Sequence, residues 1–91
     1  MALTKETVVD KIEVLEMGQV QVRTATRVLE DGVQLSSSFH RHVVDPSTKA
    51  SGSWADTDIS GEDPRVQAVA TATWTSAVKT AYQEMIDAQA L

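Results

Sequence analysis

The dipeptide Asp31-Gly32 is the feature that most constrains the fold of this 91-residue chain. It stands between two stretches in which apolar and polar residues alternate, and an Asp-Gly pair in that position is typical of a two-residue type I′ turn. Such a turn joins two antiparallel strands, which we place at about residues 19–30 and 33–44. The sequence therefore predicts a long β-hairpin in the first half of the chain.

A two-residue loop pairs Glu30 with Val33, and that pair fixes the register of the whole hairpin. The register predicts an apolar face built from three facing pairs, namely Val28 with Leu35, Thr24 with Phe39, and Val20 with Val43. It predicts a polar face from three more, namely Arg27 with Ser36, Arg23 with His40, and Gln21 with His42.

A third strand is expected at residues 11–16, joined to the hairpin by a turn at Met17-Gly18. A strict two-residue loop places Val14 beside Gln21, whereas one extra loop residue places Val14 beside Val22. We favour the second register, with a bulge centred on the glycine. Residues 11–44 are then a three-stranded antiparallel meander.

The second half of the chain reads as a loop followed by helix. Residues 45–63 are rich in Ser, Gly and Asp and show little periodicity, which is typical of a loop. Asp63-Pro64 is a helix start, with Asp as the N-cap and Pro in the first helical position. Apolar residues then recur with helical spacing up to Ile86.

Thr75 interrupts this helical stripe and is a candidate cap for a second helix, so we expect two segments, at about 64–73 and 76–89 within a helical region 64–90. The stripe should lie against the apolar side of the meander. With residues 1–10 as a loosely ordered N-terminal arm, the prediction is one small α+β domain: a three-stranded antiparallel meander with a long β-hairpin, followed by a C-terminal helix or helix pair.

The core available to such a domain is small. Only four residues are aromatic, and strands of about twelve residues span roughly 40 Å, more than one terminal helix can cover. Part of the ribbon should therefore project or pair with another chain, and we expect a homo-oligomer. The residues expected to make packing and interface contacts are Val20, Val22, Leu35, Phe39 and Val43, with Trp54 and Trp74 as anchors. Trp54 is either a lid over one edge of the core or a contact for a partner.

Charge and composition argue against several classes of function. The net charge is −5 and the eight Lys and Arg residues form no run, which disfavours a nucleic-acid surface. No apolar stretch approaches the ~18 residues of a membrane span, and residues 1–10 lack the plan of a signal peptide. Because the chain has no Cys, disulfides, thiolate zinc sites and Cys nucleophiles are excluded.

His40 and His42 are the first candidates for metal binding, because residues two apart on a strand project from the same face. One chain supplies only two ligands, so a metal site on them requires several copies around an axis. The ordinary alternative is two solvated histidines. Ser36, Ser38 and His40 share a face too, but there is no nucleophile elbow or evident oxyanion hole, and we expect neither an enzyme nor a cofactor.

Four blocks of the sequence resemble a family of small proteins encoded by tailed bacteriophages, whose genes often sit among virion and tail-fibre genes. The blocks are K-I-E-V-L-E-M-G-Q-V-Q-V-R-T-A-T-R-V-L-E-D-G-V, S-F-H-R-H-V-V-D-P, S-G-E-D-P-R-V-Q-A-V-A and W-T-S-A-V-K-T-A-Y-Q. Together they cover about residues 9–84, in the order that the family shows. The resemblance implies no catalytic residue.

What the resemblance implies is a non-enzymatic structural protein of the virion, associated with the tail or fibre, made in the host cytoplasm and acting by oligomerisation or by docking to other virion proteins. The alternative is an accessory binding module encoded by the phage, such as a fibre-assembly chaperone or an inhibitor of a host protein.

Overall fold

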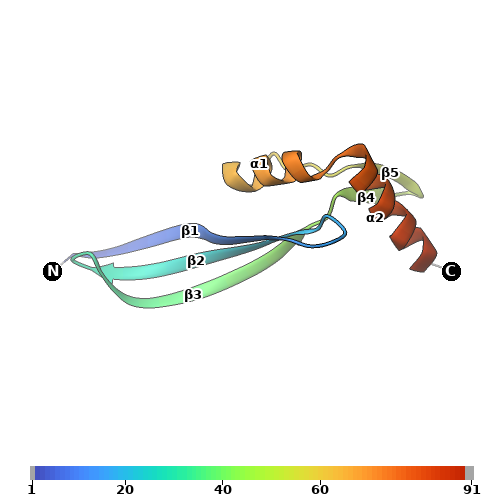
Figure 1. Cartoon of the computed structure of the whole chain (residues 1–91). Helices are drawn as coiled ribbons and strands as arrows, with labels where there is room; N and C mark the ends of the chain where they lie inside the picture. The colour runs from blue at the N-terminus through green and yellow to red at the C-terminus, as the bar shows by residue number, and fades with distance from the viewer. Residues whose placement is uncertain (1, 90–91) are drawn as a thin grey trace.

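Three long strands form an antiparallel sheet in the order β1–β2–β3, with β1 at Leu3–Val14, β2 at Val20–Glu30 and β3 at Val33–Val44 (Figure 1). The remaining elements are a hairpin of β4 (Ser47–Ala50) and β5 (Ser53–Asp56), then helices α1 (Pro64–Thr73) and α2 (Ser76–Gln89). They come from a computed structural model that describes residues 2–89. The predicted α+β class, with a meander followed by a helix pair, is confirmed.

The N-terminal arm is not loosely ordered as predicted, because residues 3–10 extend β1 along the whole length of β2. Leu3 lies opposite Glu30 at the far end of this pair. Ala2 and Asp31 then exchange hydrogen bonds, with the Ala2 N–H donating to Asp31 Oδ1 at 3.1 Å and the Asp31 N–H donating to the Ala2 carbonyl at 3.0 Å. Paired backbone groups give this segment a ladder that its polar sequence did not suggest. Residue 1 of the predicted arm and residue 90 of the predicted helical region lie outside the described residues.

The turn at Asp31-Gly32 is confirmed, and the register beyond it is wrong. Asp31 and Gly32 have φ values of 50° and 84°, and Glu30 faces Val33 as predicted. A bulge then adds Leu35 to β3, since Leu29 faces Gln34 while Val28 faces Ser36. Each later pair on β3 is therefore shifted by one residue.

The shift moves the predicted faces, because a slip of one residue sends a side chain to the other side of the sheet. Val20 faces Val44 and not Val43, and Val22 faces His42. Phe39 faces Ala25, on the opposite side of the sheet from Val20. The prediction of one wholly apolar and one wholly polar face is thus wrong.

Both registers considered for the first hairpin are also wrong, because the loop spans residues 16–18 and so begins one residue earlier than expected. Val14 faces Val20, and the Leu15 N–H donates to the Gln19 carbonyl at 2.9 Å, which leaves a three-residue loop. Gly18 has φ +90°, the conformation that the glycine was expected to supply. A second bulge, at Asp10, shifts the register of the N-terminal half of β1 by one residue, so that Lys11 faces Arg23 while Val9 faces Thr24.

Helix α1 covers one face of the sheet and packs on Val20 and Val44. The N-caps of both helices form as predicted. The Arg65 N–H donates to Asp63 Oδ1 at 2.8 Å, and the Val78 N–H donates to Thr75 Oγ1 at 3.3 Å, so both N-caps are present. The core consists of residues from the sheet and from α1 with the residue that follows it, namely Val9, Val20, Val22, Val44, Val66, Ala70 and Trp74. The predicted contact between the helical stripe and the sheet is confirmed for α1.

Residues 47–56 form the β4–β5 hairpin, so the predicted loop at 45–63 is wrong over this stretch. Its turn, Ser51-Gly52, has φ values of 52° and 80° and is of the same kind as the turn at Asp31-Gly32. Trp54 on β5 meets Tyr82 of α2 edge to face at 6.0 Å between ring centroids. The hairpin therefore gives α2 a surface to pack on, away from the main sheet (Figure 1). Burial, and then the nearby carboxylate of Asp45, raise the pKa of Tyr82.

The molecule is elongated, with extents of 58 × 25 × 23 Å. The helices and the β4–β5 hairpin lie at one end, while the three strands run on to the opposite end, where the N-terminus lies (Figure 1). Within residues 2–89, no helix combines the length and the apolar character needed to span a membrane.

Candidate functional site

The uncovered end of the sheet is the most unusual surface of the molecule. We call it the projecting arm and define it as residues 3–8 and 25–39. Neither helix covers it (Figure 1). Large apolar side chains on it are about half exposed or more: Leu3 at 62%, Val33 at 66%, Leu35 at 57% and Phe39 at 49%. A sheet with two unpaired edges that exposes large apolar side chains on both faces is a candidate site of protein association.

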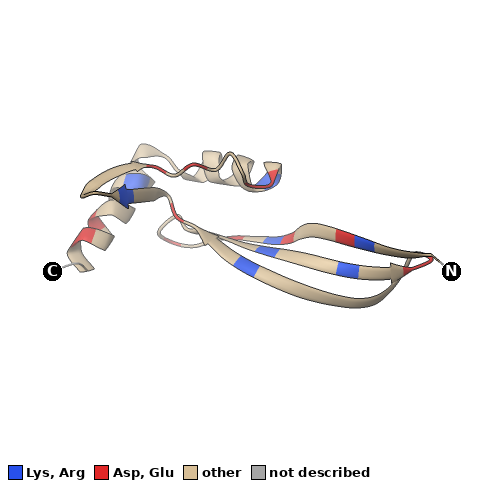
Figure 2. Ribbon diagram, turned by 180° about the vertical axis from the view of Figure 1, so that it is seen from behind, with Lys and Arg blue, Asp and Glu red and all other residues tan. Residues whose placement is uncertain are grey.

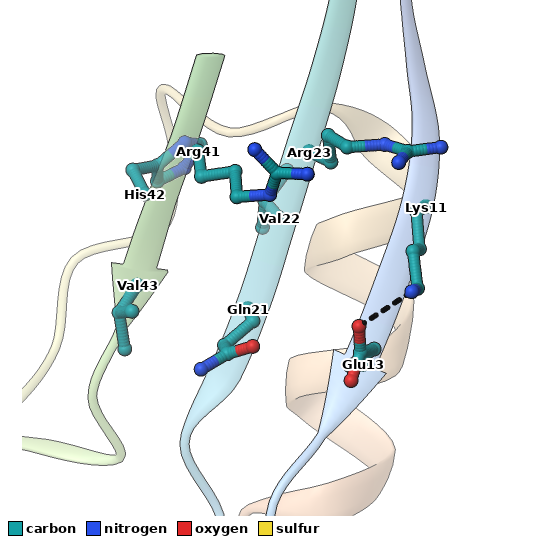
Figure 3. A pocket seen from close by; sticks show the side chains of 8 residues that line it. All are labelled: Lys11, Glu13, Gln21, Val22, Arg23, Arg41, His42 and Val43. Carbon is teal, nitrogen blue, oxygen red and sulfur yellow. Dashed lines mark ion pairs between the residues drawn. The ribbon is translucent and has the colours of Figure 1, made fainter. Parts of the chain in front are cut away.

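A second surface is the open face, the side of the sheet turned away from α1, with Lys11, Gln21, Arg23, Arg41 and Val43 on it (Figure 3). Arg23 lies at its centre. Its Nε and Nη2 donate to the two carboxylate oxygens of Asp10 at 2.9 and 2.8 Å, and its guanidinium lies 4.5 Å from the ring centroid of Phe39. These contacts fix the Arg23 side chain flat across the strands.

Beside Arg23 lies a hollow of about 150 Å³. Its lining residues come from all three strands and are Lys11, Glu13, Gln21, Val22, Arg23, Arg41, His42 and Val43 (Figure 3). Lys11 and Glu13 form an ion pair across its rim at 2.9 Å. Arg41 makes no ion pair with any residue between 2 and 89. The hollow is smaller than the roughly 300–1,000 Å³ of a typical small-molecule pocket, so it suits a single interlocking side chain better than a small molecule.

Charge is divided unevenly between the sheet and the rest of the chain (Figure 2). Residues 2–44 carry five basic and six acidic side chains, whereas residues 45–89 carry three basic and seven acidic ones. The sheet is thus close to neutral. Most of the net charge of −5 belongs to residues 45–89, which we call the body. A nearly neutral arm puts little electrostatic repulsion in the way of association.

The two histidines share a face as predicted, with ring centroids 6.2 Å apart. That face is not the predicted polar one beside Arg23 and Arg41, because the bulge at Leu35 places the histidines on the side of Val22. His42 Nε2 lies 2.8 Å from Glu62 Oε1, so one of the two ring nitrogens through which His42 could bind a metal is already in contact with a carboxylate. Among residues 2–89 no group of three or more side chains is arranged to hold a metal ion. A metal shared between copies remains a sequence prediction.

The predicted packing residues fall into two groups. Val20, Val22 and Trp74 lie in the core, and the Trp74 Nε1–H donates to the Gly18 carbonyl at 2.7 Å. Leu35, Phe39 and Val43 lie exposed on the sheet. Trp54 is half-buried against α2, and its Nε1–H donates to Asp87 Oδ2 at 3.3 Å.

Sequence reasoning missed the contacts of Arg23 with Asp10 and Phe39. No sequence signal marks these contacts, because only the register shifts at the two bulges bring Asp10 and Phe39 to the face of Arg23. It also missed the Ser51-Gly52 turn, although a Ser-Gly dipeptide is a recognised turn signal.

The Asp10–Arg23 pair predicts a specific acid sensitivity. The hydrogen bond from Arg23 lowers the pKa of Asp10 below its ordinary 3.8. A carboxyl whose pKa is depressed on folding adds stability above its unfolded pKa, and that stability is lost as the pH falls through the folded pKa. Asp10→Asn should therefore be less stable than wild type at pH 7, and the gap should shrink as the pH falls below 3.8, the ordinary pKa of the carboxyl.

Urea denaturation of wild type and Asp10→Asn at pH 7 and at lower pH measures this gap. Glu6→Gln is the control, because Glu6 pairs with Arg27 at a longer 3.4 Å with a side chain that is about half exposed. Its effect at pH 7 should be smaller. An Asp10→Asn gap that stays constant from pH 7 to pH 2 contradicts the assignment.

Comparison with known proteins yields no match: no family model fits the chain, and neither a curated protein nor a solved structure is similar to it.

Proposed function

We propose that this protein is a non-enzymatic structural component of a bacteriophage particle, associated with the tail or fibre, which acts by assembling with further copies or by docking to other virion proteins. The observation that carries the proposal is the projecting arm, whose apolar side chains and strand edges have no cover within one copy. Covering them in an assembly stabilises the complex at roughly 25 cal/mol per Å² of apolar surface removed from water.

The shape of the molecule supports an assembly role. The three-stranded sheet extends far beyond the small core, so much of its apolar surface stays exposed to water. A 91-residue domain already buries a modest fraction of its surface, so this exposure lowers a stability that is small to begin with. The assignment to a bacteriophage rests on the resemblance of residues 9–84 to small proteins encoded by tailed phages.

The content of purified particles tests this proposal. Mass spectrometry of phage particles, with a peptide standard for quantification, should find the chain at a fixed ratio to known tail or fibre proteins. Particles that lack it, produced by cells that contain it, contradict a place in the virion.

The second candidate is a phage accessory module, a fibre-assembly chaperone or an inhibitor of a host protein. The acidic body favours it, because seven acidic and three basic residues between 45 and 89 would steer the chain towards a basic partner. Such a module is present in the infected cell and absent from mature particles, so the same measurement separates the two candidates.

A further inference from the structure

We propose that the free edge of β3 pairs with the same edge of a second copy, antiparallel and around a two-fold axis at Ser37. This inference rests on the proposed assembly role and deepens it by naming the partner and the register. Two three-stranded sheets would then join into one six-stranded sheet, with the two helical bodies at opposite ends.

The edge of β1 is protected in the ways that sheet proteins use against such pairing. The Arg65 guanidinium donates to the Val9 carbonyl, so part of the edge is already occupied. The bulge at Asp10 interrupts the regular ladder close by. Charged residues recur along the strand as well, at Lys5, Glu6, Asp10, Lys11 and Glu13.

The edge of β3 lacks most of these protections. Residues 33–40 contain no Lys, Arg, Asp, Glu or Pro, and every residue from 33 to 41 is exposed. Beyond them, His42 is held by Glu62 and Val44 is buried, so the accessible edge ends there. The bulge at Leu35 bends this edge but leaves the longer part, residues 36–41, in regular pairing with β2.

The register follows from the length of the accessible edge. Residues 33–41 have their midpoint at Ser37, so antiparallel pairing over the full segment places Ser37 beside Ser37 of the second copy. Leu35 then faces Phe39 of the second copy, which puts two exposed apolar side chains together. Val33 faces Arg41 of the second copy, and no pair of like charges is opposed.

The second copy is the partner that this edge fits because the segment is complementary to itself. Its small centre, Ser36-Ser37-Ser38, allows close approach of two strands, while the apolar residues on either side exchange partners. Because the sheet carries nearly balanced charge, two arms can lie side by side without strong repulsion.

Cysteine cross-linking tests the register, since the natural chain contains no Cys. Residues directly opposite in an antiparallel pair have Cα atoms roughly 4.5–5.5 Å apart, within the range that a disulfide bridges. Ser37→Cys should therefore shift most of the chain from the monomer band to the dimer band on non-reducing gels after mild oxidation. Ser37 is exposed, so the substitution leaves the core intact.

Two variants are matched controls. Val33→Cys lies on the same strand, but in this register its two copies are roughly 26 Å apart at ~3.3 Å per residue, so it should remain monomeric on the gel. Thr7→Cys lies on β1, whose edge we infer to be unpaired, and should also remain monomeric.

The outcomes separate this inference from the function on which it rests. A Ser37→Cys dimer without dimers of the two controls supports the β3 pairing. An oligomer by light scattering in which Ser37→Cys does not cross-link, or Thr7→Cys does, overturns the β3 edge and leaves the assembly role standing. A chain that is monomeric by light scattering and does not cross-link at position 37 overturns the β3 pairing and assembly with further copies, which restricts the proposed function to docking on other virion proteins.

Discussion

Trp74→Ala should lower the free energy of unfolding by about 3–5 kcal/mol, the cost of truncating a large buried aromatic side chain. Trp74 is only 9% exposed and packs in the core at the break between α1 and α2. It also ties this break to the first turn of the sheet through its bond to the Gly18 carbonyl. A chain of 91 residues has a total stability of about 5–14 kcal/mol, so the variant should lose a large share of its stability and unfold at a clearly lower temperature than the wild type.

Chemical denaturation at equal protein concentration measures this effect, because assembly makes apparent stability depend on concentration. Trp54→Ala is the matched control: it removes the other tryptophan, which is half-buried against Tyr82, and should cost about 1 kcal/mol. Trp74→Phe keeps a ring but leaves the Gly18 carbonyl without its donor, at a cost of about 1–3 kcal/mol. Equal losses for Trp74→Ala and Trp54→Ala contradict a core centred on Trp74.

Gly18→Ala should be the next most damaging change, with a loss of about 2–5 kcal/mol from two causes. The φ of +90° disfavours any residue with a Cβ by about 1–2 kcal/mol. A Cβ at this position would also lie 2.5 Å from Val78 Cγ1 and 3.0 Å from Pro46 Cγ, and such overpacking adds about 1–3 kcal/mol.

Gly32→Ala separates the two causes, since Gly32 has φ +84° and no atom within 4 Å of an added Cβ. It should show the backbone cost alone. Val78→Ala combined with Gly18→Ala should recover part of the additional loss, because it removes the nearer of the two clashing atoms. If Gly18→Ala and Gly32→Ala are equally stable by urea denaturation, the close approach of α2 to the first turn is wrong.

The sequence was a reliable guide wherever a local signal decides the structure. The Asp31-Gly32 turn, the Asp63-Pro64 start of α1 and the Thr75 cap of α2 were all predictable, because each depends on neighbouring residues and their backbone preferences. The limits of β3 and of both helices followed from these signals.

Strand registers were not predictable, because they depend on bulges that the pattern of residues does not mark. The arm has apolar and polar side chains exposed on both sides, so a shift of one residue costs little burial there and alternation alone cannot choose a register. The bulge at Leu35 lets Val44 enter the core and brings Phe39 to Arg23. That contact, like the Asp10–Arg23 pair, joins residues that are distant in the sequence and appears only in three dimensions.

The prediction of a ribbon longer than its helices can cover depended on strand length alone, which is why it could be made from the sequence. The residues that the arm exposes could be foreseen only in part. Leu35 and Phe39 were expected on the sheet surface that packs, and Val33 was not singled out, yet all three are exposed on one strand. Their shared edge is visible only once the bulge and the unpaired side of β3 are known.

The most direct measurement of the central claim, that the projecting arm is an assembly surface, is the mass of the purified chain by size-exclusion chromatography with light scattering. At micromolar concentration the wild type should have a mass of at least twice the 9.9 kDa of one copy. Leu35→Lys, which changes an exposed side chain on the arm, should shift the mass towards the monomer with an unchanged circular dichroism spectrum. A stable wild-type monomer across this concentration range contradicts the claim.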